Sequence, residues 1–158
     1  ESYQTKFQRK AECYSHETLE YIICLDAKAS WLTVGELLSI ARDELGPDAE
    51  LELGRDVLEK LVCPQCGFEE EMFMSLGKVE ASKASCPRCK AAHREVVTFF
   101  KISGDESFLN LTLADIGVPP FDIIMARSAA RAIGFELMGD APQVLGSLTM
   151  RDDVGGGA

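Results

Sequence analysis

The chain has 158 residues and a mass of 17.3 kDa, which fits one or two domains and excludes a large multidomain enzyme. Its 16 basic and 26 acidic residues give a net charge of −10, which disfavours binding to nucleic-acid phosphates. The apolar runs are short of the roughly 20 residues that a membrane span needs. Because the sequence starts at Glu1 rather than Met, we expect a piece of a longer chain. Because no apolar leader follows Glu1, we expect neither a signal nor a transit peptide and place the protein in the cytoplasm.

The first third of the sequence predicts a linker, a strand and a capped helix. Residues 1–17 are polar and weakly patterned, which indicates a linker or extended segment. Leu19–Leu25 is rich in apolar, β-forming residues and predicts a buried strand, with Cys24 as a small core residue. The capping box Thr33–Glu36, followed by apolar residues at helical spacing, predicts a helix that ends at Leu45.

The middle third is expected to lead into and out of a metal-binding segment. Glu50–Leu53 alternates charge with Leu and predicts a strand with one buried face. Arg55–Leu61 predicts a short helix. Phe68–Met74 predicts a strand whose three glutamates form a solvated edge, and Gly77–Ser85 is small and polar, as expected of a loop. Arg94–Ile102 has the composition of a buried strand.

The last third predicts a short helical turn and a hairpin. Leu113–Gly117 is the expected turn of helix, and Asp122–Ala126 and Ala132–Leu137 are the expected strands. A helix over residues 122–132 is the competing interpretation, and Gly134 with a β-branched pair favours the hairpin. The core is expected to include Ile22, Leu37, Leu38, Val97, Phe99 and Ile124.

Four of the six cysteines form two pairs with metal-ligand spacing. The pairs are Cys63–Cys66 and Cys86–Cys89, each with two residues between its cysteines, and residues 67–85 lie between the pairs. Two intervening residues bring both thiolates of a pair to one metal, and two such knuckles supply four sulfurs for tetrahedral coordination. The spacing predicts a structural Zn²⁺ on Cys63, Cys66, Cys86 and Cys89, with no position open for water.

The same cysteines leave alternatives. Iron bound by the same four thiolates is the alternative to zinc. Two disulfides or free thiols are the alternative in which no metal is bound. His93, four residues past Cys89, is a candidate replacement ligand, although four cysteines already complete the shell. Cys13 lies near His16, but no motif supports a nucleophile, so we interpret it as an ordinary cysteine.

Several motifs together resemble one protein family. Trp31–Leu38, Thr112–Pro120, Phe135–Asp140 and the two Cys-Pro-x-Cys knuckles resemble the C-terminal region of bacterial ThiF/HesA-type adenylyltransferases, which are relatives of ubiquitin-activating enzymes. The order of elements is similar to that of the β-grasp fold of ubiquitin. Residues Thr112–Asp115 also resemble the Thr-Leu-Ser-Asp turn of ubiquitin. The resemblance spans roughly residues 15–140.

This resemblance implies an α+β fold with a β-grasp-like, ubiquitin-like mixed sheet and one main helix, interrupted by a zinc-ribbon insert with four cysteine ligands. The β-grasp-like domain is expected over residues 18–61 and 95–140, and the insert over residues 62–94. Residues 1–17 then form the linker and residues 141–158 a flexible tail.

The implied function is a non-catalytic interaction domain that recruits a ubiquitin-like modifier or a conjugating-enzyme-like protein. ATP-dependent activation needs a glycine-rich phosphate loop, and the one glycine cluster is Gly155–Gly157, so no catalytic residue is expected. The alternatives are a free-standing ubiquitin-like modifier, motivated by those glycines, and a rubredoxin-like iron electron carrier. Neither nucleic acid nor membrane is an expected partner.

Overall fold

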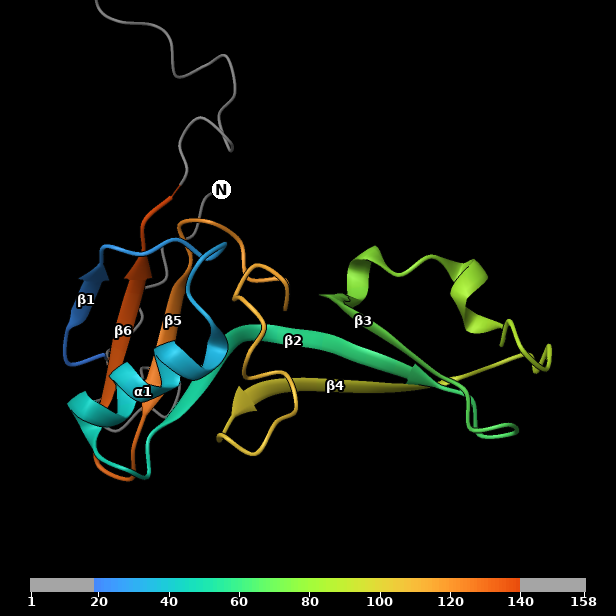
Figure 1. The fold of residues 1–158 in the computed structure, drawn as a ribbon, viewed down its shortest axis with the longest axis horizontal. Helices are drawn as coiled ribbons and strands as arrows, with labels where there is room; N and C mark the ends of the chain where they lie inside the picture. The colour runs from blue at the N-terminus through green and yellow to red at the C-terminus, as the bar shows by residue number, and fades with distance from the viewer. Residues whose placement is uncertain (1–18, 140–158) are drawn as a thin grey trace, which may run out of the picture.

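The structure, a computed structural model, describes residues 19–139. Over that range it is an α+β fold with one α-helix, α1 (Val34–Leu45), and a mixed sheet of six strands (Figure 1). The strands are β1 (Ile22–Leu25), β2 (Glu50–Val62), β3 (Glu69–Ser75), β4 (Glu95–Ile102), β5 (Ile123–Arg127) and β6 (Ala132–Leu137). Their order is β1-β6-β5-β2-β3, with β4 paired to β2. The α+β class, the mixed sheet and the single main helix agree with the sequence prediction.

Some sequence predictions concern the ends of the chain. Cys13, the linker over residues 1–17, the tail over residues 141–158 and its cluster Gly155–Gly157 lie outside the described residues. Within residues 19–139, no helix is long and apolar enough to cross a membrane.

The helix forms where the capping box predicts it. The Glu36 backbone N–H donates to Thr33 Oγ1 at 3.2 Å, and the Thr33 N–H donates to Glu36 Oε2 at 2.9 Å. These two bonds satisfy donors that have no partner inside the helix. The helix ends before Gly46, whose φ of 108° suits a residue without a side chain.

The hydrophobic core lies between α1 and one face of the sheet. Leu37 and Leu38 from the helix meet Leu51, Ile124 and Phe135 from three strands, and each is at most 2% exposed. Burying a side chain of this size stabilises the fold by about 1.5–3 kcal/mol. We call this part, residues 19–56 and 103–139, the body.

The first strand differs from its prediction. β1 pairs in parallel with β6, but it is the outermost strand of the sheet and has a paired neighbour on one side alone among the described residues. Ile22 is 45% exposed and Cys24 is exposed, so the predictions of a buried strand and of a core Cys24 are wrong. The apolar composition of the segment hid its place at an edge.

The predicted helix over Arg55–Leu61 is also wrong. These residues continue β2, a 13-residue strand that leaves the body and runs outward beside β4 (Figure 1). Over Val57–Val62 it is hydrogen-bonded to β3 on one side and to β4 on the other. Two strand neighbours satisfy the backbone of this segment, and this tertiary pairing overrides local helix propensity. We call residues 57–102 the arm.

The arm shows further differences from the sequence reading. β4 pairs with β2 but is buried only at its last residue, Ile102. Val96 is 55% and Phe100 46% exposed, and the predicted core residues Val97 and Phe99 are half-buried. The expected loop contains two short 3-10 helices, η1 (Leu76–Lys78) and η2 (Ala81–Ala84), and η1 contacts β2. The strand expected from Phe68 is present as β3.

The segments of the last third match their predictions in part. The hairpin of β5 and β6 is present, with Ile124 opposite Phe135. Residues 113–117 form a hydrogen-bonded turn rather than helix. The turn begins with reciprocal bonds, since Asp115 Oδ2 accepts from Thr112 Oγ1 at 2.7 Å and the Asp115 N–H donates back at 3.1 Å.

Candidate metal centre

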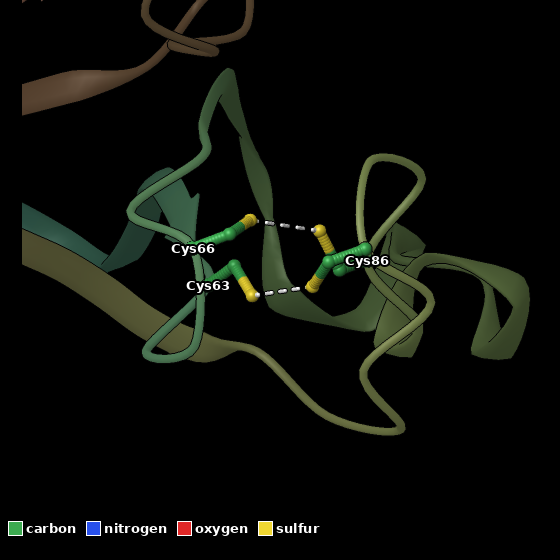
Figure 2. A group of neighbouring side chains, drawn as sticks. Cys63, Cys66 and Cys86 are labelled. Atoms are coloured by element: carbon green, nitrogen blue, oxygen red, sulfur yellow. Dashed lines mark hydrogen bonds between the residues drawn. The ribbon is translucent and has the colours of Figure 1, made fainter.

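Four cysteines meet at the outer end of the arm. Cys63 directly follows β2, and Cys86 and Cys89 lie in the turn that precedes β4. The four Sγ atoms, including that of Cys66, all lie within 4.8 Å of one another. Figure 2 shows the labelled side chains pointing toward one another from two separate turns. The structure thus brings together the four residues that the spacing selected.

The sulfur–sulfur distances fit a metal better than disulfides. Cys63 Sγ lies 3.5 Å from Cys89 Sγ, and Cys66 Sγ lies 3.7 Å from Cys86 Sγ. A tetrahedral zinc with bonds of about 2.3 Å places its sulfurs about 3.8 Å apart, whereas a disulfide needs about 2.05 Å. All four cysteines are free thiols in the structure. The donor set therefore suits one four-coordinate ion, zinc or iron.

The two knuckles have the same backbone architecture. Each is closed by two hydrogen bonds between backbone groups: Cys63 N to Phe68 O (2.9 Å) and Gly67 N to Cys63 O (2.8 Å), and Cys86 N to Ala91 O (2.9 Å) and Lys90 N to Cys86 O (2.9 Å). Gly67 and Lys90 occupy equivalent positions and have left-handed φ values of 68° and 64°. The knuckle geometry demands this conformation, so the lysine carries a strain that the glycine does not.

The thiols differ in acidity. Burial favours the neutral form of Cys86, but the backbone N–H groups of Cys89 and Arg88 outweigh it and lower the pKa of Cys86 to about 6. The Phe68 N–H favours the thiolate of Cys66, yet burial and hydrogen bonds with the neighbouring cysteines raise the pKa of Cys66 to about 12. Four thiolates cannot share this space without a cation, and a bound metal ion supplies the charge that lets them ionise together.

The remaining candidate ligands and nucleophiles lie elsewhere. His93 is exposed and does not belong to the cluster of potential ligands. The Cys24 thiol donates to Glu136 Oε2 at 3.2 Å, and this carboxylate raises the pKa of Cys24, so the thiol is not activated for attack.

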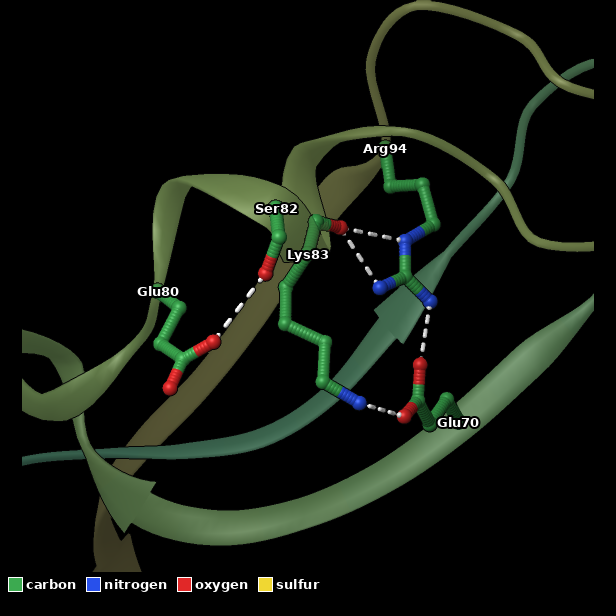
Figure 3. A network of polar contacts seen from close by, with 5 residues as sticks. All are labelled: Glu70, Glu80, Ser82, Lys83 and Arg94. Atoms are coloured by element: carbon green, nitrogen blue, oxygen red, sulfur yellow. Dashed lines mark hydrogen bonds and ion pairs between the residues drawn. The ribbon is translucent and has the colours of Figure 1, made fainter.

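A polar cluster behind the knuckles was missed by sequence reasoning. The Arg94 side chain is 1% exposed; its Nη1 donates to Glu70 Oε2 at 2.7 Å, and its Nε and Nη2 donate to Lys83 O at 2.9 and 2.6 Å (Figure 3). Lys83 Nζ forms an ion pair with the other oxygen of Glu70. A nearby Ser82–Glu80 hydrogen bond of 3.2 Å helps to order η2. Glu70 is thus a partner of a buried cation rather than part of a solvated edge.

No family model matches this chain, and neither a curated protein nor a solved structure matches it.

Proposed function

We propose that this chain is a non-catalytic protein-interaction domain whose arm is held together by a structural zinc ion. The observation that carries the proposal is the cluster of four Sγ atoms within 4.8 Å of one another. The cluster lies at the outer end of the arm, where few apolar side chains are buried. Closed four-thiolate sites of paired knuckles are typical of structural zinc, which contributes folding energy directly.

The composition of the cluster supports a structural role. Four thiolates complete a tetrahedral shell and leave no coordination position at which a water molecule could be activated. Backbone N–H groups already hydrogen-bond to the sulfurs of Cys66, Cys86 and Cys89, as in a site built to hold its ion permanently. The metal would therefore fix the two turns to each other rather than take part in chemistry.

The surface of the arm supports a protein partner. Val96, Phe100 and Leu76 are 55, 46 and 43% exposed, and the arm projects from the body (Figure 1). Large exposed apolar side chains on a projecting element are typical of interaction surfaces. We propose a ubiquitin-like modifier or a conjugating-enzyme-like protein as the partner.

The same proposal includes the family and fold suggested by the motifs. Two of the segments that resemble ThiF/HesA-type enzymes lie in contact, since Thr33 bridges to Thr112 and the Val34 N–H donates to Leu111 O at 3.0 Å. One helix across a mixed sheet supports a β-grasp-like body, and the arm with its knuckles supports a zinc ribbon between β2 and β4.

Metal analysis tests the first part of the proposal. The purified chain is expected to be colourless and to contain one zinc per chain by elemental analysis. A red, iron-containing protein would support the electron-carrier alternative instead. A protein without any metal would remove the basis of the proposal.

The partner is tested in a longer ThiF/HesA-type protein, in which the proposal expects this chain to be one segment. Deleting the segment is expected to abolish transfer of the modifier while ATP-dependent adenylylation continues. Unchanged transfer would contradict the recruiting role, whatever the metal content.

A further inference from the structure

A cavity lies where the arm joins the body. It has a volume of about 320 Å³ and is lined by Arg55 of β2, by residues 73–75 and Lys78 at the end of β3 and in η1, and by Gly117 and Pro119. This volume is at the lower end of the range for ligand sites, so the cavity suits one or two side chains rather than a large cofactor. None of the four cysteines of the candidate metal centre lines it.

The backbone around the cavity is fixed in unusual conformations. β3 has a bulge between its pairs Leu58–Met74 and Lys60–Glu71, and Phe73 in this bulge has a φ of 43°. Gly117, with a φ of 86°, approaches so closely that a Cβ there would lie 3.2 Å from Phe73 O. The wall of the cavity is therefore formed by the close approach of an arm strand to a loop of the body.

The cavity has an excess of positive charge. Arg55 Nη2 donates to Gly117 O at 3.0 Å, which fixes the orientation of the guanidinium, and it lies 3.9 Å from Asp122 Oδ2. The Lys78 side chain is exposed and forms no hydrogen bond or ion pair with any residue of the described range 19–139. Two cations and one nearby carboxylate leave a local charge of +1 on a chain whose net charge is −10.

We propose that this cavity binds the carboxylate of an acidic residue in a segment of the partner protein. The carboxylate lies between Lys78 and Arg55, and an apolar side chain next to it packs on Met74 and Pro119. A carboxylate carries one negative charge, which matches the local charge of +1. A phosphate dianion carries one more negative charge, which Asp122 and the acidic chain would repel. The inference rests on the proposed protein-interaction function and names the chemistry of its partner.

Short peptides test the proposal on the zinc-loaded chain. The probe is the blocked peptide acetyl-Gly-Leu-Glu-Gly-amide, and its twins carry Gln or phosphoserine in place of Glu. Binding is followed by amide chemical shifts in NMR titrations. The Leu-Glu peptide is expected to shift the amides of residues 75–78 and Gly117, and to bind more tightly than either twin. Equal binding of the Gln twin, or tighter binding of the phosphoserine twin, would overturn the carboxylate assignment.

Lys78→Gln is the deciding variant, because the side chain is exposed and no described contact depends on it. It is expected to weaken binding of the Leu-Glu peptide about fivefold or more, as removal of a partly desolvated charge partner does. Lys28→Gln, which removes one positive charge that lies over the Trp31 ring and outside the cavity, is the matched control and leaves affinity unchanged. Equal effects of the two variants would contradict the site.

Two further measurements separate the sources of failure. Isocaproate offers the same carboxylate and apolar group as a free small acid, and if it bound as tightly as the peptide, the protein-segment assignment would be wrong. Zinc content is measured on the same samples. If the zinc-loaded chain bound none of the peptides, this inference would be wrong and the proposed zinc-stabilised domain would stand. If the chain contained no zinc, the proposed function itself would be wrong.

Discussion

Body and arm share the strand β2 and differ in what lies between their secondary-structure elements. In the body, α1 covers one face of the sheet, and Leu37 and Phe135 belong to a continuous apolar cluster. This cluster also includes Val57 and Ile102 at the inner end of the arm. In the rest of the arm, residues 58–101, which we call the outer arm, the buried apolar side chains are Leu58 and Leu61, next to two buried cysteines and the buried Arg94. A segment with so little apolar surface to bury needs a further source of stability, and a metal ion is the common one. The arm and the body should therefore fail under different perturbations.

Loss of a metal ligand is expected to have the largest effect. Cys63→Ser or Cys89→Ser should abolish zinc binding and unfold the outer arm, because structural zinc contributes on the order of 10 kcal/mol to such sites. Hydrogen exchange should show loss of protection in β3 and β4, about a hundredfold or more, while α1 stays protected.

The matched control for this experiment is Cys24→Ser, which removes an exposed thiol outside the cluster. It should leave zinc content and arm protection unchanged. If neither ligand variant lowered zinc content or stability, the assignment of the four cysteines as ligands would be wrong.

The converse perturbation acts on the body. Phe135→Ala replaces a side chain that is fully buried in the apolar cluster of the body and should lower the free energy of unfolding by about 3–5 kcal/mol. Chemical denaturation followed by circular dichroism measures this loss, and the native variant should still bind one zinc. Leu76→Ala, at a 43% exposed position of the arm, is the control and should change stability little. Loss of zinc from the folded Phe135→Ala variant would show that the two regions are not separable.

The difference between the regions also explains what the sequence could predict. The capping box at Thr33, the hairpin of β5 and β6 and the cysteine spacing are local patterns, and local patterns are readable without knowing the tertiary fold. The prediction of a helix over Arg55–Leu61 was wrong because pairing with β3 and β4, which are distant in the sequence, determines the conformation of this segment. Exposure of Cys24 likewise depends on the place of β1 in the sheet.

The polar cluster of the arm shows the same limit. Arg94 and Glu70 are separated by 24 residues, and their contact depends on how β3 and β4 lie on either side of β2. The sequence offered two signals, an arginine directly before an apolar strand and a run of glutamates, but nothing in it indicated that they meet. A pairing set by strand neighbours needs the fold before it can be seen.

A smaller effect is expected when this pair is broken. Glu70→Gln leaves the buried guanidinium of Arg94 without its counter-charge and should destabilise the arm by about 2 kcal/mol. Lys83 and Arg94 lower the pKa of Glu70 below its ordinary value of 4.5, so its contribution is complete above pH 4.5 and is lost as the pH falls through the lowered pKa.

Hydrogen exchange of η2 and β4 at several pH values measures this contribution as the difference between wild type and Glu70→Gln. Acid also releases zinc from both proteins, so the contribution of Glu70 is read from the difference in protection between wild type and variant at each pH, not from the absolute stability of either. Glu71→Gln changes a neighbouring exposed glutamate and serves as the control. A difference that grew as the pH fell below 4.5 would contradict the charge assignment.

The smallest effect is expected from substitutions at the equivalent left-handed positions of the two knuckles. Lys90 has a φ of 64° where the first knuckle has Gly67 at 68°, and a left-handed conformation disfavours a residue with a side chain by about 1–2 kcal/mol. Glycine is also more flexible in the unfolded chain, which offsets up to about 1 kcal/mol of the relief. Lys90→Gly should therefore stabilise the arm by up to about 1 kcal/mol, and Gly67→Ala should destabilise it by a similar amount. Competition for zinc with a chelator measures both changes, and shifts of equal sign in the two variants would refute the equivalence of the knuckles.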